Sequence, residues 1–270
     1  MIKKNELIEM ITDRIDQSTK DAVDQWENKN FHAQFFYIDD LLDKEIVKKI
    51  YLSFPFHSNI KLNQFNSFRE KKKTFAKIDK LDPIIPIVTD AFHDKKIIKS
   101  IEKITKIPKL EPDPSLYAGG LSMMDKDDYL NPHIDNSHDS QRKLFRKLNL
   151  LYYITPDWLY EYGGNLELWD KEVKDKITIH SKFNRLVVMN TNKSSVHSVN
   201  KVLVDKTRCC LSNYYFSKNS SYYNDYYHVT SFYGRPEEKI KRLYYRFDNF
   251  VRQQFANTLN VTRGKKYKRK

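Results

Sequence analysis

The order of apolar and polar residues divides the chain into a helical first part, a strand-rich middle and one last helix. In residues 1–24 the apolar side chains recur near helical spacing, which predicts a short amphipathic helix. Residues 39–53 predict a second helix, because Asp39 or Asp40 can cap it and an apolar stripe follows. Helices therefore precede any sheet in this chain.

The middle of the chain changes to a strand pattern. Residues 60–80 are polar and basic, and we expect a loop or an exposed strand there. Residues 83–107 again show helical spacing, which predicts one or two helices packed on a sheet. After Pro114, short apolar or alternating runs predict strands at 117–124, 131–135, 148–154, 165–169, 184–190, 195–200 and 208–216. Repeated short strands of this kind are typical of an antiparallel sandwich or barrel.

A final helix is predicted over 237–259, directly after Pro236. Its apolar residues recur at three- and four-residue steps: Ile240, Leu243, Tyr244, Phe247, Phe250, Val251 and Phe255. We expect this stripe to pack against the body of the protein. Closure of this helix over the active site and a homodimer interface are the alternative interpretations.

Composition indicates a globular domain with one substantial core. The chain has 270 residues, of which 40% are hydrophobic and 31% charged. No apolar run approaches the roughly 20 residues that span a bilayer, and the N-terminus lacks a secretory signal. Cys209 and Cys210 are adjacent, so on a strand they would point to opposite faces and form no disulfide with each other. We therefore expect a cytoplasmic protein.

The formal net charge is +13, with basic runs at 71–73 and 265–270. Such runs can contact nucleic acid, anionic lipid or another acidic partner. A solvated surface and a frayed terminus need no partner, and we favour that interpretation.

Two histidines, one aspartate and one arginine form an ordered set in the strand-rich part. His133 and Asp135 are two residues apart, so on a strand both side chains share one face. His197 and Arg208 follow in later apolar runs. Two histidines and one carboxylate can occupy one face of an octahedral Fe(II) and leave three positions open for a co-substrate and O₂. A zinc hydrolase could use the same three ligands, but it would leave Arg208 unexplained.

Residues 117–216 resemble the double-stranded β-helix core of prolyl 4-hydroxylase-like 2-oxoglutarate/Fe(II) oxygenases. The resemblance implies an α+β protein with a mainly β, jelly-roll or cupin-like core, covering N-terminal helices and a C-terminal helix. We expect an oxygenase domain over 1–232 with its core at 115–217, and a helical extension with a basic tail over 233–270. The matching pieces are 129–136, 148–154, 163–169, 183–189, His197 and 208–216.

The resemblance also implies roles for the ordered set. His133, Asp135 and His197 would bind Fe(II), and Arg208 would pair with the distal carboxylate of 2-oxoglutarate through its guanidinium fork. The implied reaction uses O₂ to hydroxylate an unactivated C–H bond and releases succinate and CO₂, and ascorbate is a further cofactor that the family admits. The substrate would be a small molecule, a sugar precursor or an amino-acid or prolyl side chain. Asp135 favours hydroxylation, because halogenating relatives carry a small residue there.

The co-substrate pocket has further candidates. Asn149 and Tyr153 share one face of a predicted strand, the face that lines this pocket in the family, and Tyr153 is the candidate hydroxyl donor. Many relatives carry another co-substrate tyrosine about ten residues before the first histidine, where this chain has Met123 and Met124. Tyr117 or Tyr129 could replace it.

Two alternatives share the fold. A non-catalytic binding protein of this class would have lost metal ligands, which are intact here. A nucleic-acid oxidative demethylase needs a second arginine at the position of Tyr214, so we expect no nucleic-acid partner. We assign neither His138 nor His180 to the metal. Candidate substrate contacts, for which structural roles are equally open, are Asn136, Arg142 and Trp169.

Overall fold

Thirteen strands of the computed structural model form one curled antiparallel sheet within residues 2–30, 33–56, 59–220, 227–259 and 268–269, which are the residues that the structure describes. Along the sheet the order is β1-β10-β7-β12-β5-β3-β6-β11-β8-β9, while β13 pairs with β6, β2 with β3 and β4 with β12. The strands are β1 (Phe35–Ile38), β2 (Asn63–Asn66), β3 (Glu70–Phe75), β4 (Glu111–Pro112), β5 (Gly120–Met124), β6 (Tyr129–Ile134), β7 (Phe145–Tyr153), β8 (Leu166–Trp169), β9 (Lys176–Ile179), β10 (Arg185–Asn190), β11 (His197–Val199), β12 (Arg208–Ser217) and β13 (Ser231–Phe232).

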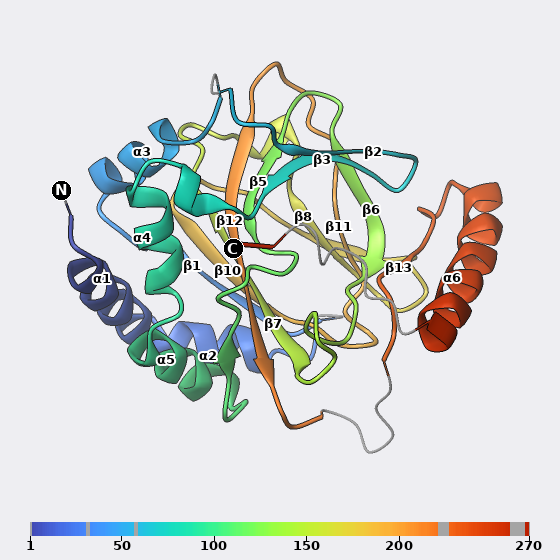
Figure 1. Cartoon of the computed structure of the whole chain (residues 1–270), viewed down its shortest axis with the longest axis horizontal. Helices are drawn as coiled ribbons and strands as arrows, with labels where there is room; N and C mark the ends of the chain where they lie inside the picture. The colour runs from blue at the N-terminus through green and yellow to red at the C-terminus, as the bar shows by residue number, and fades with distance from the viewer. Residues whose placement is uncertain (1, 31–32, 57–58, 221–226, 260–267, 270) are drawn as a thin grey trace.

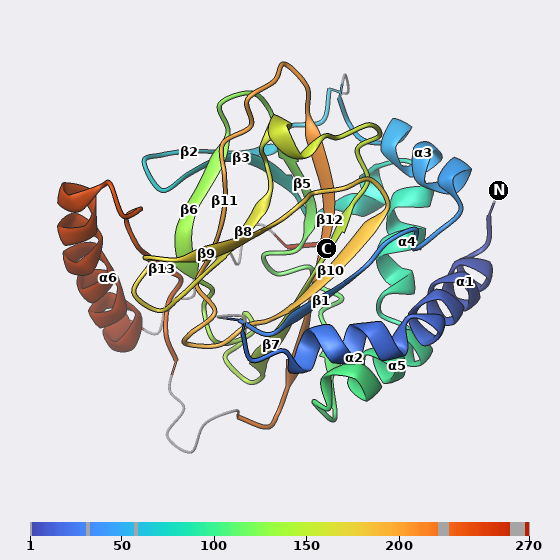
Figure 2. The ribbon, with the colours of Figure 1, turned by 180° about the vertical axis from the view of Figure 1, so that it is seen from behind.

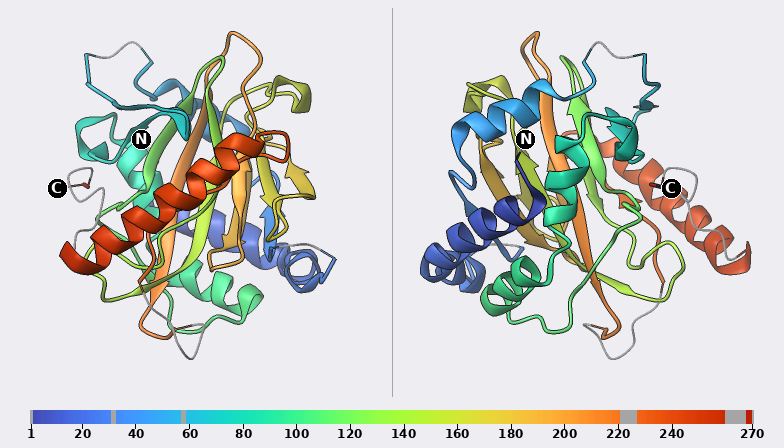
Figure 3. Two further views of the ribbon diagram at one scale, coloured as in Figure 1. Left: turned by 90° about the vertical axis from the view of Figure 1, so that its right-hand side faces the viewer. Right: turned by 60° about the vertical axis from the view of Figure 1, so that its left-hand side comes forward.

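Helices cover one side of this sheet. Figures 1 and 2 show α1, α2, α4 and α5 packed together along its outer face, with α3 above them. In Figure 3, α6 lies alone on the opposite side and runs diagonally across it. The arrangement confirms the predicted double-stranded β-helix with covering helices. The helices are α1 (Lys4–Gln17), α2 (Thr19–Glu27), α3 (Lys44–Leu52), α4 (Ile84–Ala91), α5 (Lys95–Thr105) and α6 (Lys239–Leu259), with short 3-10 turns η1 (Ile78–Lys80) and η2 (Tyr160–Tyr162).

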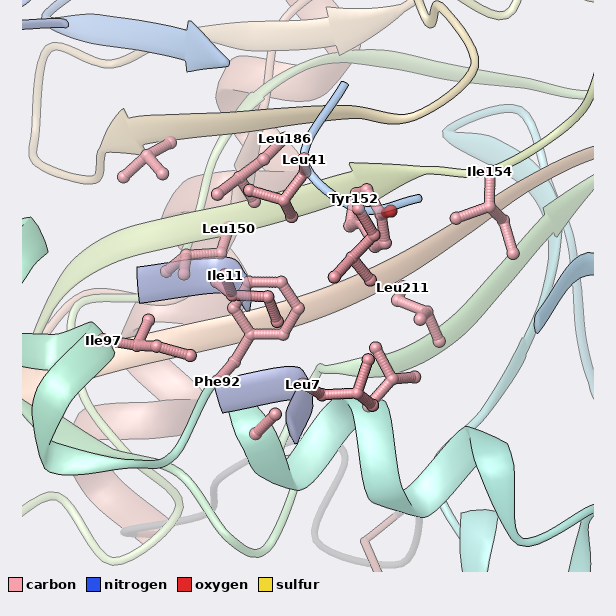
Figure 4. Close-up of a cluster of buried hydrophobic side chains, with 14 of the residues drawn as sticks. Leu7, Ile11, Leu41, Phe92, Ile97, Leu150, Tyr152, Ile154, Leu186 and Leu211 are labelled. Carbon is pink, nitrogen blue, oxygen red and sulfur yellow. The ribbon is translucent and has the colours of Figure 1, made fainter. Parts of the chain in front are cut away.

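The main core lies between the covering helices and the strands β7, β10 and β12 (Figure 4). Alternate residues of β7 face this core, among them Leu150 and Tyr152, which are 1% exposed. The residues between them face the inside of the curled sheet. On β12 the same alternation sends Cys209 into this core and Cys210 into a second cluster, and both cysteines are free. The strand period thus separates the structural face from the face that lines the interior.

The N-terminal helices differ from the expectation in their ends. The predicted helix over 1–24 is two helices, because the chain breaks at Ser18. The cap of α3 is Asp43, whose carboxylate accepts from the backbone N–H of Glu45 at 2.8 Å, so the assignment of Asp39 or Asp40 was wrong. Asp40 has a φ of 52°, which a right-handed helix excludes.

Of the two alternatives for the basic segment 60–80, a loop or an exposed strand, the structure has strands: β2 and β3 form a hairpin, and β3 lies between β5 and β6 in the sheet. Each lysine of the run 71–73 is paired with a carboxylate: Lys71 with Asp128, Lys72 with Glu70 and Lys73 with Asp125. The positive charges of this run are therefore each paired with a carboxylate and do not form a free cationic patch. Of the predicted tail 265–270, only Lys268 and Arg269 lie within the described residues, and Arg269 pairs with Asp79 and Asp90.

The final helix forms as predicted, but its expected orientation was wrong. Its polar side contacts the body: Asp248 pairs with Arg69, Asn249 hydrogen-bonds the backbone of Phe232 and Arg252 donates to the carbonyl of Thr230. These polar groups satisfy the backbone around the short strand β13, and they turn the apolar stripe outward. Among the described residues, no helix is long and apolar enough to cross a bilayer. The exposed large apolar residues of α6 are Ile240, Leu243, Tyr244, Phe247, Phe250, Phe255 and Leu259.

A buried histidine in the covering layer predicts acid sensitivity. His93 Nε2 lies 3.0 Å from Asn213 Oδ1, and burial lowers the pKa of His93 below 6.5 although Asp90 opposes the shift. The folded state therefore disfavours protonated His93. Neutral His93 makes its full contribution to the free energy of unfolding above pH 6.5, and this contribution is lost as the pH falls through the folded pKa. We expect the free energy of unfolding to fall less between about pH 7 and pH 5 in His93→Gln than in wild type, measured by urea denaturation. Equal losses in the two proteins would contradict this.

Candidate active site

The antiparallel pair β6 and β11 brings the two predicted histidine ligands together. His133 and His197 are directly opposite each other in the register, with ring centroids 4.2 Å apart. Asp135 follows the last residue of β6, on the same face as His133. Phe232 of β13 stacks on His133 with centroids 5.2 Å apart. Two distant parts of the sequence thus meet on neighbouring inner strands of the curled sheet.

The three side chains could hold one metal ion. One ligand atom from each of His133, Asp135 and His197 lies within 4.8 Å of the others. Each histidine Nδ1 lies 3.0 Å from a backbone carbonyl, that of Asn131 or Ser195. A carbonyl only accepts, so each Nδ1 carries the proton and each Nε2 keeps a free lone pair towards the centre of the cluster. This is the tautomer that a metal requires.

Charge in the cluster favours a cation. Burial raises the pKa of Asp135, but Arg146 and the two histidines outweigh it and hold that pKa well below its usual range. Burial and the neighbouring His133 lower the pKa of His197 to about 4. Near neutral pH the cluster therefore offers an ionised carboxylate and a neutral imidazole from His197.

The ligand cluster opens into a cavity of about 540 Å³. Arg208, Asn149 and all three ligands line it. Its outer walls come from different parts of the chain, since β3 and α6 both contribute. Apolar residues along these walls include Phe65, Leu130, Val229, Phe232, Phe255 and Leu259.

Beside the ligands, two predicted residues present polar groups without partners. Arg208 is 3% exposed, and no carboxylate pairs with it in the part of the chain that the structure describes. Its Nη1 donates to the sulfur of Met124 at 3.7 Å, its Nε makes no hydrogen bond with any described residue, and its guanidinium lies 4.8 Å from the ring centre of Tyr153. The buried Tyr153 hydroxyl makes no hydrogen bond with any described residue, and burial raises the pKa of Tyr153 to about 12. An anionic ligand with acceptor oxygens would satisfy Arg208, which lines the cavity; Tyr153 lies against Arg208 but does not line the cavity itself.

The other predicted pocket and substrate residues divide into those that line the cavity and those that do not. Tyr117 lines the cavity, whereas the Tyr129 hydroxyl donates to the carbonyl of Ser67 away from it. Asn136 also lines the cavity. Arg142 stacks on Tyr227, 3.7 Å from the ring centre, and the indole of Trp169 donates to Ser198; neither lines the cavity.

Neither of the remaining histidines joins the metal cluster. His138 lies 2.7 Å from the hydroxyl of Ser137, and His180 Nε2 lies 2.9 Å from the carbonyl of Trp158.

Several residues of the site were missed from the sequence. Glu70 and Lys72 reach the cavity from β3, where we expected a loop or an exposed strand, and α6 supplies Arg252, Phe255, Ala256 and Leu259. Arg146, beside Asp135, was also missed. The pairing of Glu70 and Lys72 on one strand face was readable from their spacing, and α6 lines the cavity, as the alternative of closure over the active site expected.

Residues 119–216 match the 2OG-Fe(II) oxygenase superfamily. No curated protein matches the sequence. A prolyl-4-hydroxylase from Pseudomonas putida is similar in structure, with 13% identity and a TM-score of 0.56 over 74% of this chain and 100% of that one. A prolyl hydroxylase from Trichoplax adhaerens, in complex with a hypoxia inducible factor peptide, has 17% identity and a TM-score of 0.51 over 76% and 92%. SnoN, an alpha ketoglutarate dependent epimerase from nogalamycin biosynthesis, has 12% identity and a TM-score of 0.51 over 75% and 84%.

The family match and the ligand cluster together define the class. Residues 119–216 are the core of a 2-oxoglutarate/Fe(II) oxygenase that resembles prolyl 4-hydroxylases in fold. The chain is therefore a 2-oxoglutarate/Fe(II)-dependent dioxygenase, and its cofactors are Fe(II) and 2-oxoglutarate.

Proposed function

We propose that this enzyme hydroxylates an unactivated C–H bond of a small molecule, a sugar precursor or an amino-acid or prolyl side chain. The observation that carries the proposal is the His133–Asp135–His197 cluster at the base of a largely apolar cavity, beside the buried Arg208. When bound there, Fe(II) and 2-oxoglutarate would activate O₂ to break such a bond: one oxygen atom would enter the hydroxylated product and the other the succinate that forms, with CO₂, from 2-oxoglutarate.

The protein's own residues would bind and orient the co-substrate. Arg208 would pair with its distal carboxylate, because a guanidinium fork matches two carboxylate oxygens. The unpartnered Tyr153 hydroxyl would donate to the same carboxylate. Asn149 faces the cavity but donates to the Tyr214 hydroxyl at 3.2 Å, so its part would be to hold the wall of the pocket.

The cavity favours a substrate with an apolar group. Its volume of about 540 Å³ lies within the range of small-ligand sites. The buried side chains of Leu130 and Phe232 line it, and such apolar walls exclude water from a reacting C–H bond. A prolyl ring or a small alicyclic molecule meets this requirement, and solved structures of similar fold include both prolyl hydroxylases and an epimerase from nogalamycin biosynthesis.

The test has two stages. Anaerobic addition of Fe(II) and then 2-oxoglutarate should produce the visible charge-transfer band of the chelate. Succinate release should then be measured with proline-containing peptides, free amino acids and sugar-derived small molecules. A substrate-dependent increase together with an oxygenated product would support the proposal. A folded, iron-loaded protein without the band would contradict it.

We also propose that α6 forms a homodimer through its outward apolar stripe. Leu243 and Phe247 are 71% and 68% exposed, in the middle of that stripe. The exposed basic residues of α6 are Lys239, Lys241 and Arg246, all in its N-terminal half. An antiparallel pair would place them near the negative C-terminal end of the partner helix, where cations are stabilised.

Replacing Leu243 and Phe247 together with glutamate should convert a dimer into a monomer, because the charges would be buried without partners at the interface. The measurement is sedimentation velocity across the micromolar range. Leu203→Glu is the matched control, since Leu203 is 59% exposed but lies outside α6. A wild-type protein that stays monomeric at high concentration would refute the interface.

A further inference from the structure

Arg146 is a buried cation beside the metal-ligand carboxylate. Its side chain is 1% exposed, and none of its guanidinium nitrogens makes a hydrogen bond within the described part of the chain. Three aromatic rings surround it, with the guanidinium carbon 4.1 Å from the ring centre of Tyr214, 5.6 Å from Phe216 and 5.8 Å from Tyr117. The negative group in contact with it is Asp135, whose Oδ2 lies 3.3 Å from Nη1.

This environment restricts what Arg146 can do. Aromatic faces attract a cation, but they do not replace the hydration that a fully buried guanidinium loses. The charge of Asp135 supplies most of the compensation. The cage also closes Arg146 off from the large cavity, which it does not line, so a bound substrate would not reach it.

A β-bulge aims Arg146 at the site. On β7, Asn149 faces the cavity, so regular alternation would send residue 146 to the other side. The register with β12 shifts, however, because Leu148 pairs with Tyr215 and Arg146 with Phe216, which leaves Lys147 as an extra residue. Such bulges redirect side chains beside active sites.

Both oxygens of Asp135 face the histidines. Oδ1 lies 3.6 Å from His133 Nε2, and Oδ2 lies 4.0 Å from His197 Nε2. A carboxylate in this position could give a metal either one oxygen or both. With one, the two histidines and Asp135 leave three of six positions open; with both, only two remain. A bidentate co-substrate would then fill the site completely.

We propose that Arg146 is a positioning residue that holds Oδ2 of Asp135, so that only Oδ1 would bind the metal. The aromatic cage prevents the guanidinium from moving away, and its charge makes Oδ2 the poorer metal ligand. Arg146 thereby keeps one coordination position free once 2-oxoglutarate is bound. This inference rests on the iron site proposed above.

Nitric oxide tests the free position without turnover. It binds Fe(II) where O₂ would, and the product has a distinctive electron paramagnetic resonance signal. Wild type and Arg146→Met should be loaded anaerobically with Fe(II) and 2-oxoglutarate, checked by the charge-transfer band and titrated with nitric oxide. Because outer-shell partners typically change metal-site properties by about 10–100-fold, the apparent Kd for nitric oxide should rise at least tenfold in Arg146→Met.

A matched control exists on the neighbouring strand. Arg185 is also a buried arginine over an aromatic ring, 4.1 Å from the centre of Tyr37, and it pairs with Asp39 far from the metal cluster. Arg185→Met should bind nitric oxide as wild type does, whatever it costs in stability. Should Arg146→Met fail to fold, Arg146→Gln keeps hydrogen-bond donors, removes the charge and should show the same loss.

Two results would overturn the inference. One is wild-type nitric oxide affinity in a loaded Arg146 variant. The other is a folded variant that no longer binds Fe(II), because a released Asp135 should still coordinate the metal. A wild-type protein that gives no charge-transfer band would instead refute the proposed iron and 2-oxoglutarate site, so the two failures are distinguishable.

Discussion

Replacing His197 with alanine should abolish the Fe(II)/2-oxoglutarate charge-transfer band and all substrate-dependent succinate release. His197 supplies one of three ligand atoms that lie within 4.8 Å of one another, and its Nδ1–H is fixed by the carbonyl of Ser195. Loss of an outer-shell partner already costs about 10–100-fold, so loss of the ligand should weaken metal binding by more than about 100-fold. The measurement is an anaerobic Fe(II) titration followed by 2-oxoglutarate.

The control for this variant is His180→Ala, which removes a histidine outside the cluster. It should bind Fe(II) as wild type does. The fold of His197→Ala should persist, because the imidazole lies at the cavity surface and its removal leaves no buried charge without a partner. Wild-type iron affinity in a folded His197→Ala protein would remove this residue from the ligand set.

The second large effect is expected at Arg208. Truncating one partner of a buried charge pair costs about 3 kcal/mol, so Arg208→Ala should weaken 2-oxoglutarate binding roughly 100-fold. Fe(II) binding without 2-oxoglutarate should stay within a few-fold of wild type, because Arg208 is not a metal ligand. The measurement is the 2-oxoglutarate concentration at which the charge-transfer band is half formed. Arg142→Ala, which alters an arginine outside the cavity, is the control.

Replacing Arg208 should weaken 2-oxoglutarate binding without lowering the stability of the metal-free protein. Without co-substrate its guanidinium is buried with no carboxylate partner among the described residues, which is unfavourable. Arg208→Met should therefore leave the Tm of the metal-free protein unchanged or raise it, while 2-oxoglutarate should no longer raise the Tm of the iron-loaded form. A large loss of Tm in the metal-free variant would instead indicate a structural role for Arg208.

Much of the fold was readable because its signals are local. Alternation along 148–154 and 208–216 separates residues that face the helices from residues that face the cavity, and the structure keeps that division over most of both strands. The spacing of His133 and Asp135 placed them on one face for the same reason. The oxygenase class followed from these short-range patterns together with the order of His197 and Arg208.

Three features of the structure could not be predicted from residue type and short-range spacing. Residues 70–75 look polar and exposed, yet they form a strand inside the sheet because their lysines find carboxylates on neighbouring segments. The stripe on α6 obeys helical periodicity, yet hydrogen bonds to the backbone around β13 hold the polar side inward. Arg146 reaches Asp135 only because a bulge reverses the alternation.

The sequence by itself determined the secondary structure of the core, the identity of the three candidate ligands and the class of chemistry, because each depends on residue type and short spacing. The tertiary structure alone decided which face α6 exposes, which segments line the cavity and that Arg146 contacts Asp135. Those outcomes depend on contacts between residues far apart in the chain, where the satisfaction of backbone groups and buried charges outweighs local pattern.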